Sequence, residues 1–259
     1  MPGWRNGIRT TLKMSRPKGS VGSSPTPGTS RSPPPYDGGF CGAIAFSPIG
    51  YNKSMVITLQ EGDSLCIRRG VHALREGGVI AFPTETTYGI GCDPRNNNAV
   101  RRIFRLKGRD PVKTLLLVAS SFKQAESVAI IEGPARELAK KYWPGPLTLV
   151  LPVRKDANLA RGAFVAGTVA IRVSSSPIVQ RLTHAFGFPI VATSANRTGE
   201  QNNRSSAAVR ELFGERVDVI LDGGTLPLRS VSTLARVDDD GNISVLRKGA
   251  IRLPSRIHS

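Results

Sequence analysis

Two patterns of apolar residues alternate along most of the chain. One has apolar residues three or four positions apart, as in helices, and the other is a short continuous apolar run, as in buried strands. Over residues 63–76, apolar positions three or four residues apart form one stripe and predict an amphipathic helix, which Asp63 is expected to cap. Residues 79–82 are short and wholly apolar, so they predict a buried strand that Pro83 ends. The same patterns predict helices from Asn98, over 134–142 and over 178–186, strands over 114–119, 147–151, 169–173, 190–193 and 219–221, and a hairpin around 238–242.

Strands and helices alternate over residues 55–259. This order predicts one α/β domain, α+β by some classifications, in which helices flank a layered sheet. The hairpin around 238–242 adds an antiparallel pair, so the sheet is expected to be mixed.

The first 54 residues have a different composition. They contain 8 Pro, 9 Gly and 8 Ser, with seven basic residues and one acidic residue, and we expect a disordered extension or a basic arm that binds nucleic acid. The segments GSSP (22–25) and WRNG (4–7) can be translations of the T-arm and D-arm of transfer RNA genes. We therefore expect that this reading frame passes through an upstream tRNA gene and that the native start is Met55.

Charge narrows the classes of partner. Lys and Arg number 36 against 19 Asp and Glu, a formal net charge of +17, which indicates nucleic acid or a nucleoside triphosphate as partner, or an ordinary basic surface. No apolar run is long enough to cross a membrane. The three cysteines form no Cys-x-x-Cys pattern, which indicates a reducing compartment, and we expect a cytoplasmic protein.

Several common catalytic signatures are absent from the sequence. It contains no phosphate loop of the Gly-x-x-x-x-Gly-Lys-Ser/Thr type, no Gly-x-Gly-x-x-Gly fingerprint and no His-Glu-x-x-His zinc helix. The three histidines accompany no nucleophile elbow, so a Ser-His-Asp hydrolase is not favoured.

Arg172 stands in an otherwise apolar strand. Alternation over 168–173 places Thr168, Ala170 and Arg172 on one face of that strand. A buried guanidinium requires an anion, because an unpaired buried charge is unfavourable. The anion is either an acidic side chain of this protein or a bound ligand, and the strand alone does not decide between them.

Two further groups of polar residues flank apolar strands. Ser194 and Asn196 directly follow the strand over 190–193, at an edge where open α/β sheets place ligands. Lys107, Arg109 and Lys113 precede the strand over 114–119 and can hold a triphosphate. The structural alternative for Ser194 and Asn196 is a capped turn, and the alternative for the three basic residues is a solvated run of charges.

Seven segments, in order, resemble the YrdC-like threonylcarbamoyl-AMP synthases. They are PTETTYGIGCD (83–93), RIFRLKGR (102–109), WPGPLT (143–148), VAIRV (169–173), TSANRTG (193–199), ILDGG (220–224) and LRKGAI (246–251). No single segment is decisive, but the ordered set is specific and extends over most of residues 55–259.

The resemblance implies a fold and a reaction. The fold is a three-layer YrdC-like domain with a twisted mixed sheet and a concave basic cavity, in a short form without the extra C-terminal domain of longer members. The reaction joins L-threonine, bicarbonate and ATP into threonylcarbamoyl-AMP and pyrophosphate, with Mg²⁺. The product supplies the N6-threonylcarbamoyl group of adenosine 37 in tRNA, so the tRNA-modifying transferase machinery is an implied partner.

The resemblance also assigns site residues. Thr86, Tyr88, Arg172, Ala192 and Ser232 correspond to the threonine pocket. The ATP contacts correspond to Lys107, Arg109, Lys113, Thr168, Ser194, Asn196, Asn202 and Arg247. Lys107, Arg109 and Arg172 are the expected catalytic residues, and no protein metal ligands are expected.

The sequence departs from the family at three places. Val118 replaces a threonine-contacting His, Val231 replaces a Glu beside Ser232, and Lys248 replaces a Pro. The alternative from another class is therefore a YrdC-like protein that binds tRNA or double-stranded RNA with little or no catalysis. A carbamoyl-adenylate enzyme of the hydrogenase-maturation type is less favoured, because its YrdC-like module lies within a much longer chain.

Overall fold

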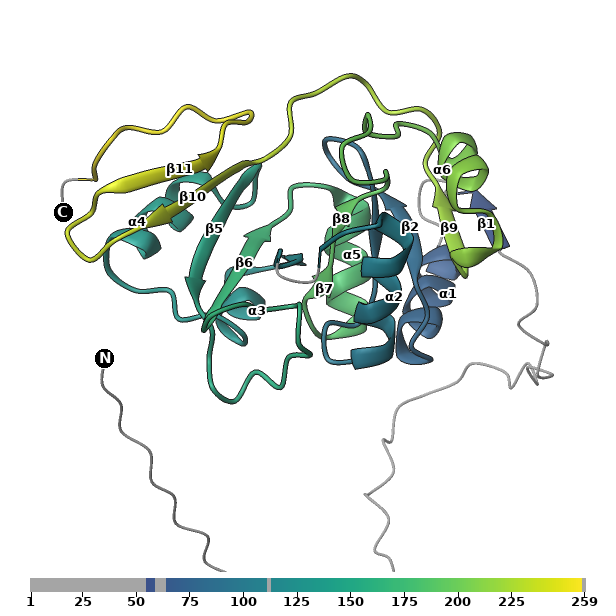
Figure 1. The fold of residues 1–259 in the computed structure, drawn as a ribbon, viewed down its shortest axis with the longest axis horizontal. Helices are drawn as coiled ribbons and strands as arrows, with labels where there is room; N and C mark the ends of the chain where they lie inside the picture. The colour runs from purple at the N-terminus through teal and green to yellow at the C-terminus, as the bar shows by residue number, and fades with distance from the viewer. Residues whose placement is uncertain (1–54, 59–63, 111–112, 258–259) are drawn as a thin grey trace, which may run out of the picture. The chain divides into compact units, whose positions relative to one another are not determined.

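The fold contains two mixed sheets, which agrees with the α/β class and divides the expected sheet in two (Figure 1). The computed structural model describes residues 55–58, 64–110 and 113–257. The first sheet has the order β1 (Met55–Thr58), β9 (Val219–Asp222), β2 (Ile80–Pro83), β3 (Tyr88–Gly91) and β8 (Thr193–Ser194). The second has the order β11 (Ile243–Arg247), β10 (Thr233–Val237), β5 (Leu147–Pro152), β6 (Thr168–Val173), β4 (Leu116–Ala119) and β7 (Ile190–Val191).

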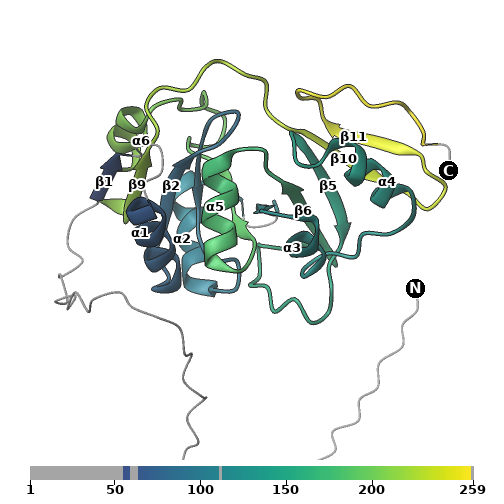
Figure 2. The same cartoon turned by 180° about the vertical axis from the view of Figure 1, so that it is seen from behind.

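Helices pack on both sheets (Figures 1 and 2). They are α1 (Ser64–Arg75), α2 (Asn97–Lys107), α3 (Phe122–Glu126), α4 (Gly133–Tyr142), α5 (Pro177–Phe186) and α6 (Ser206–Phe213), followed by a 3₁₀ turn over Gly214–Arg216. The helices α1 and α5 share one apolar cluster with β2, in which Leu74, Leu182 and Phe82 are buried. This cluster fixes the first sheet against the helical layer.

The helix α2 begins and ends at residues with suitable chemistry. The side chain of Asn96 accepts hydrogen bonds from the backbone N–H groups of Asn98 and Ala99, so Asn96 is the N-cap, two residues before the predicted start. Gly108 ends the helix in the left-handed conformation, at φ 57°, which glycine adopts without a steric penalty. These two caps place Lys107 at the last turn of α2.

The predicted strand over 190–193 is two strands in two different sheets. Its first part, β7, pairs with β4 in the second sheet, and its last part, β8, pairs with β3 in the first sheet. Gly91 makes this crossing possible, because a Cβ there would lie 2.0 Å from the carbonyl oxygen of Val191. One short segment therefore belongs to both ladders.

Other predicted elements are confirmed with shifted ends, and some elements were missed. The hairpin β10–β11 turns at Gly241, at φ 82°, where Asp238 accepts a hydrogen bond from the backbone of Asn242. The strands β1 and β3 and the helices α3 and α6 were not predicted. Two glycines in β3 weaken the strand signal, and α3 has only five residues. The Asp63 cap and the expectations for residues 1–54 lie outside the described residues.

Within the described ranges, no helix is both long and apolar enough to cross a membrane.

Candidate functional site

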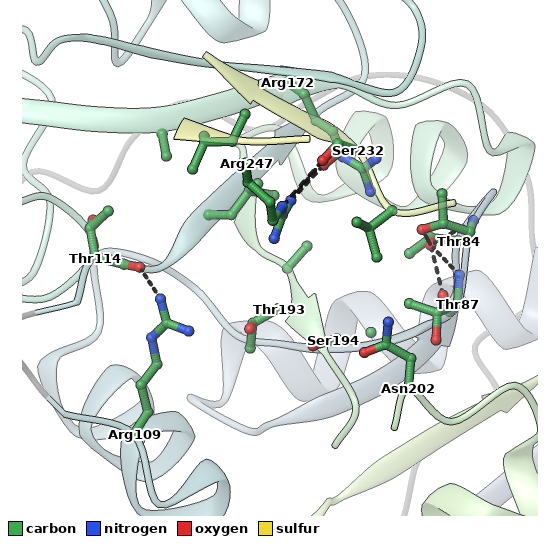
Figure 3. Close-up of a pocket in the computed structure, with 17 residues that line it drawn as sticks. Thr84, Thr87, Arg109, Thr114, Arg172, Thr193, Ser194, Asn202, Ser232 and Arg247 are labelled. Carbon is green, nitrogen blue, oxygen red and sulfur yellow. Dashed lines mark hydrogen bonds between the residues drawn. The ribbon is translucent and has the colours of Figure 1, made fainter. Parts of the chain in front are cut away.

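A pocket of about 350 Å³ lies where the two sheets meet (Figure 3). Ala192, which joins β7 to β8, and the two residues of β8, Thr193 and Ser194, contribute to its wall. The lining residues come from both sheets and their loops, and they are Thr84, Thr86, Thr87, Gly89, Arg109, Thr114, Leu116, Ala170, Arg172, Ala192, Thr193, Ser194, Asn202, Val231, Ser232, Leu234 and Arg247. Eight of the residues predicted from the sequence are among them: Thr86, Arg109, Arg172, Ala192, Ser194, Asn202, Ser232 and Arg247.

The turn between β2 and β3 forms one wall. The hydroxyl of Thr84 donates to the carbonyl of Thr87 at 2.6 Å and accepts from the backbone N–H groups of Thr86 and Thr87 at 3.2 Å. Thr87 also donates through its hydroxyl to the carbonyl of Asn203 at 2.5 Å. A side chain that bonds its own turn in this way fixes the turn without help from a ligand.

Arg172 lies on β6 and is 5% exposed. One of its terminal nitrogens, Nη1, donates to the carboxylate of Glu85, and the hydroxyl of Ser174 donates to the other oxygen of Glu85 at 2.7 Å. Burial lowers the pKa of Arg172, and the charge of Glu85 opposes this shift. Its Nε is buried, and no described atom accepts a hydrogen bond from it.

An acidic side chain of the protein and an anionic ligand can therefore both pair with Arg172. Glu85 is the acidic partner within the protein, and the unpartnered Nε–H remains for a second acceptor. A buried donor without a partner is unfavourable by about 1–3 kcal/mol, so an acceptor supplied by a ligand would be stabilising.

Arg247 reaches the same pocket from β11. Its Nη2 donates to the carbonyl and to the hydroxyl of Ser232, both at 3.0 Å. The hydroxyl of Ser232 is also hydrogen-bonded to that of the buried Thr148, at 3.0 Å. The pocket walls partly bury the guanidinium and remove water from it, although the residue as a whole is exposed. This desolvation, followed by the charges of Arg172 and Arg109, lowers the pKa of Arg247.

Arg109 follows α2 and lies across the pocket from Arg247 (Figure 3). Its Nη2 donates to the carbonyl of Thr114 at 3.0 Å, and its Nε donates to that of Lys113 at 3.3 Å. Partial burial lowers its pKa. Three guanidinium groups thus line one pocket, and the described residues that line it include no Asp or Glu.

Lys107 is buried beside the pocket and is not among its lining residues. Its Nζ donates to the carbonyls of Ser194 and Asn196 at 2.5 and 2.8 Å, and to the side-chain oxygen of Asn196 at 3.1 Å. Burial, and then the charge of Arg109, lower the pKa of Lys107 from 10.5 to about 8. All three ammonium protons are engaged within the protein, so this lysine fixes the turn after β8.

Asn196 links this lysine to the wall. Its side-chain oxygen accepts from the hydroxyl of Ser194 at 2.5 Å, and its amide nitrogen donates to the carbonyl of Glu200 at 2.6 Å. Ser194 lines the pocket, whereas Asn196 lies behind it. Asn202 is exposed and lines the pocket from the following loop.

Three other predicted residues lie outside the lining set. Tyr88 is fully buried, and its hydroxyl donates to the carbonyl of Gly224 and accepts from the N–H of Gly223, both at 2.9 Å. Thr168 stands at the far end of β6 from Arg172, and its hydroxyl donates to Val165. The side chain of Lys113 is exposed. The first two side chains are satisfied by structural hydrogen bonds.

Sequence reasoning missed Glu85, the side chain that pairs with Arg172. A signal was present, because a guanidinium in an apolar strand requires an anion, and Glu85 directly precedes Thr86, which was already assigned to the site. Val118, at which the family resemblance led us to expect a histidine, is fully buried in the apolar cluster of α1 and α5 and does not line the pocket.

The charges and donors of this pocket suit an anionic ligand with more than one acidic group. Arg172 offers a buried donor on β6, while Arg109 and Arg247 offer further positive charge, and guanidinium groups bind carboxylate and phosphate oxygens well. Hydroxyl and amide groups of Thr86, Ser194 and Asn202 add neutral hydrogen-bonding capacity.

Known proteins resemble this chain in sequence and in fold. A family model named Sua5_yciO_yrdC, described as telomere recombination, matches residues 72–249. The threonylcarbamoyl-AMP synthase of Photobacterium profundum is 42% identical over 164 residues, which are 61% of this chain and 87% of that protein.

Two solved structures extend the comparison to the fold. The P. abyssi Sua5 structure complexed with L-threonine has a TM-score of 0.66 and 34% identity, over 76% of this chain and 58% of that one. E. coli YciO has a TM-score of 0.70 and 26% identity, over 79% of this chain and 99% of that one. With the family model matching more than half of its residues, the chain belongs to the Sua5/YciO/YrdC family.

Proposed function

We propose that this protein is a threonylcarbamoyl-AMP synthase, which converts L-threonine, bicarbonate and ATP into threonylcarbamoyl-AMP and pyrophosphate. The observation that carries the proposal is the unpartnered, buried Nε–H of Arg172 in a pocket that Arg109 and Arg247 also line. The relatives support the chemistry, because the Photobacterium protein is named for this activity and the Sua5 structure holds L-threonine.

L-Threonine would lie near β6, with its carboxylate on Arg172. Thr86, Ala192 and Ser232 would surround the rest of the amino acid, since all three line the same pocket. A carboxylate on the Nε–H of Arg172 would satisfy the one buried side-chain donor that lacks a partner among the described residues.

ATP would place its phosphates near Arg109 and Arg247, with Ser194 and Asn202 as neutral contacts. Mg²⁺ would be bound by the phosphate oxygens, because the lining side chains offer hydroxyl and amide oxygens but no carboxylate, and the described residues contain no group of three or more His, Cys, Asp or Glu that could hold a metal. When bound, this ion supplies charge neutralisation for the leaving pyrophosphate.

The reaction needs positioning and charge stabilisation more than a protein base. Bicarbonate takes up a proton and releases water to give CO₂, and the threonine amine then adds to CO₂ to form a carbamate and releases one proton. A carbamate oxygen then attacks the α-phosphorus. The new O–P bond forms as the bond to the bridging oxygen of pyrophosphate breaks. Arg172 would hold the nucleophile by its carboxylate, and Arg109 and Arg247 would stabilise the negative charge that develops on the phosphates.

The proposed product has a downstream use. Threonylcarbamoyl-AMP would pass to the tRNA-modifying transferase machinery in the cytoplasm, which places the threonylcarbamoyl group on adenosine 37. Direct binding of tRNA or double-stranded RNA to the basic surface is a separate question, and steep salt dependence would reveal it.

An adenylate assay tests the proposal. The purified full chain is incubated with α-labelled ATP, Mg²⁺ and bicarbonate, with and without L-threonine, and the labelled adenylate and pyrophosphate are measured. We expect threonine-dependent product that Arg172→Ala abolishes, whereas Arg154→Ala, an exposed arginine paired with Asp156, retains it. Folded protein that forms no threonine-dependent adenylate but binds RNA with steep salt dependence would replace this proposal with the RNA-binding function.

A further inference from the structure

Glu85 divides its two carboxylate oxygens between two partners. One oxygen accepts from Nη1 of Arg172, and the other accepts from the hydroxyl of Ser174 at 2.7 Å. The Glu85 side chain is 9% exposed and that of Arg172 is 6% exposed, so both charges lie largely out of solvent. Ser174 follows β6 directly, and the three groups therefore form one fixed unit beside the pocket.

This division leaves part of the guanidinium unused. A carboxylate that is free to turn commonly binds two guanidinium nitrogens at once. Ser174 holds the second oxygen of Glu85, and Glu85 reaches Arg172 only through Nη1. The opposite fork of the guanidinium, which contains Nε–H, retains a buried donor without a partner among the described residues. Glu85 thus compensates the charge of Arg172 without occupying the fork that a ligand carboxylate would use.

We propose that Glu85 is a positioning residue for the amino-acid carboxylate, which it orients through Arg172. This inference rests on the proposed function and assigns a role to a side chain that does not itself line the pocket. Without Glu85, the long and flexible Arg172 side chain would be held at no point by a charged partner, and the Nε fork would lose its fixed direction. Ser174 acts one step further away, by preventing Glu85 from turning onto both nitrogens.

The test separates orientation of Arg172 from general damage to the fold. Glu85→Gln and Ser174→Ala are compared with wild type in the full chain, with Glu137→Gln, an exposed glutamate on α4, as the matched control. Steady-state adenylate formation gives KM for L-threonine, KM for ATP and kcat. Competition with L-threoninol, which lacks the carboxylate, measures binding that does not use Arg172.

We expect Glu85→Gln to raise KM for L-threonine at least tenfold, with KM for ATP and kcat within about twofold of wild type. Affinity for L-threoninol should change less than twofold, because threoninol makes no carboxylate contact. Ser174→Ala keeps the charge pair and should raise KM for L-threonine three- to fivefold. Glu137→Gln should match wild type. Ser174→Ala keeps the test decisive if Glu85→Gln fails to fold.

Three outcomes would overturn the role of Glu85. Unchanged or tighter L-threonine binding in Glu85→Gln would mean that Glu85 competes with the substrate or does nothing for it. Equal losses for L-threonine and L-threoninol would mean a purely structural contribution. If the wild-type protein forms no threonine-dependent adenylate, the proposed function fails and this inference fails with it. In the first two outcomes, an active wild type together with an inactive Arg172→Ala means that the proposed function stands and only the inference fails.

Discussion

The two sides of the pocket hold their cations in different ways. On the side of the first sheet, Lys107 uses all three ammonium protons on the turn that carries Ser194 and Asn196. On the side of the second sheet, Arg172 is paired through one nitrogen and keeps another buried N–H without a partner among the described residues. Both cations are almost completely buried, so burial alone does not show which one binds a ligand.

The difference lies in whether the donors are satisfied. A cation whose donors are all used by its own protein fixes a wall, whereas a cation with an open donor is ready for an anion. By this criterion we expect Lys107 to fix the wall of the site and Arg172 to bind the substrate. The family resemblance assigns ATP binding to Lys107, and we expect this contribution to be indirect, through Ser194 and the turn after β8. The following predictions test this difference between Lys107 and Arg172.

Among the tests of this comparison, the largest effect is expected for Lys107→Met. Three buried or half-buried oxygens would each lose the hydrogen bond from Lys107, so we expect the free energy of unfolding to fall by roughly 2 kcal/mol and activity to fall about 100-fold. Urea denaturation and the adenylate assay measure the two quantities. Lys140→Met, at an exposed lysine paired with Glu137, is the matched control and should change neither. Wild-type stability combined with a raised KM for ATP alone would show that Lys107 contacts the phosphates directly.

A second prediction uses the lowered pKa of Lys107, about 8 instead of 10.5. The ammonium loses its proton as pH rises through this value, and the neutral amine has only two N–H donors for three acceptors. We therefore expect kcat/KM for ATP to decline above about pH 8. Lys107→Arg, whose guanidinium stays charged, should lack this decline even if it is less active. Since CO₂ also decreases as pH rises, only a decline that differs between the two proteins supports the prediction.

The smallest effect is expected for Ser232→Ala. The hydroxyl joins Arg247 to Thr148, but the Ser232 carbonyl keeps its own bonds to Arg247. Only the bond to Arg247 involves a pocket cation, and its loss corresponds to about 1 kcal/mol, or about a fivefold loss in kcat/KM. A much larger loss, measured in the same assay, would mean that the hydroxyl contacts substrate itself.

The regular part of the fold was predictable from sequence, because long elements carry strong periodic signals. The predicted strand over 169–173 and the predicted helices over 134–142 and 178–186 agree with β6, α4 and α5 to within one residue at each end. The strand β3 was missed because its sequence, Tyr-Gly-Ile-Gly, is shaped by the close approach of Val191 and not by strand propensity. The presence of two sheets in place of one could not be predicted, because it depends on pairing between strands far apart in the chain, which local sequence patterns do not reveal.

The candidate site was predictable in part, for a similar reason. Alternation in β6 identified Arg172 as a side chain that needs an anion, and the structure places eight predicted residues around one pocket. Glu85 was not identified, because the pairing joins positions 87 residues apart in the chain. The role of Lys107 also could not be read from its spacing, since a lysine that binds phosphate and a lysine that binds a turn have the same sequence signature.

The crossing segment from β7 to β8 limits how the pocket can open. Its two ends belong to different ladders, while Ala192, Thr193 and Ser194 lie in the wall itself. A hinge motion that separates the two sheets would have to shear one of these short ladders, because the few peptide units between them cannot stretch. The distance between the two sheets at the binding site is thus tied to the covalent geometry of this short segment.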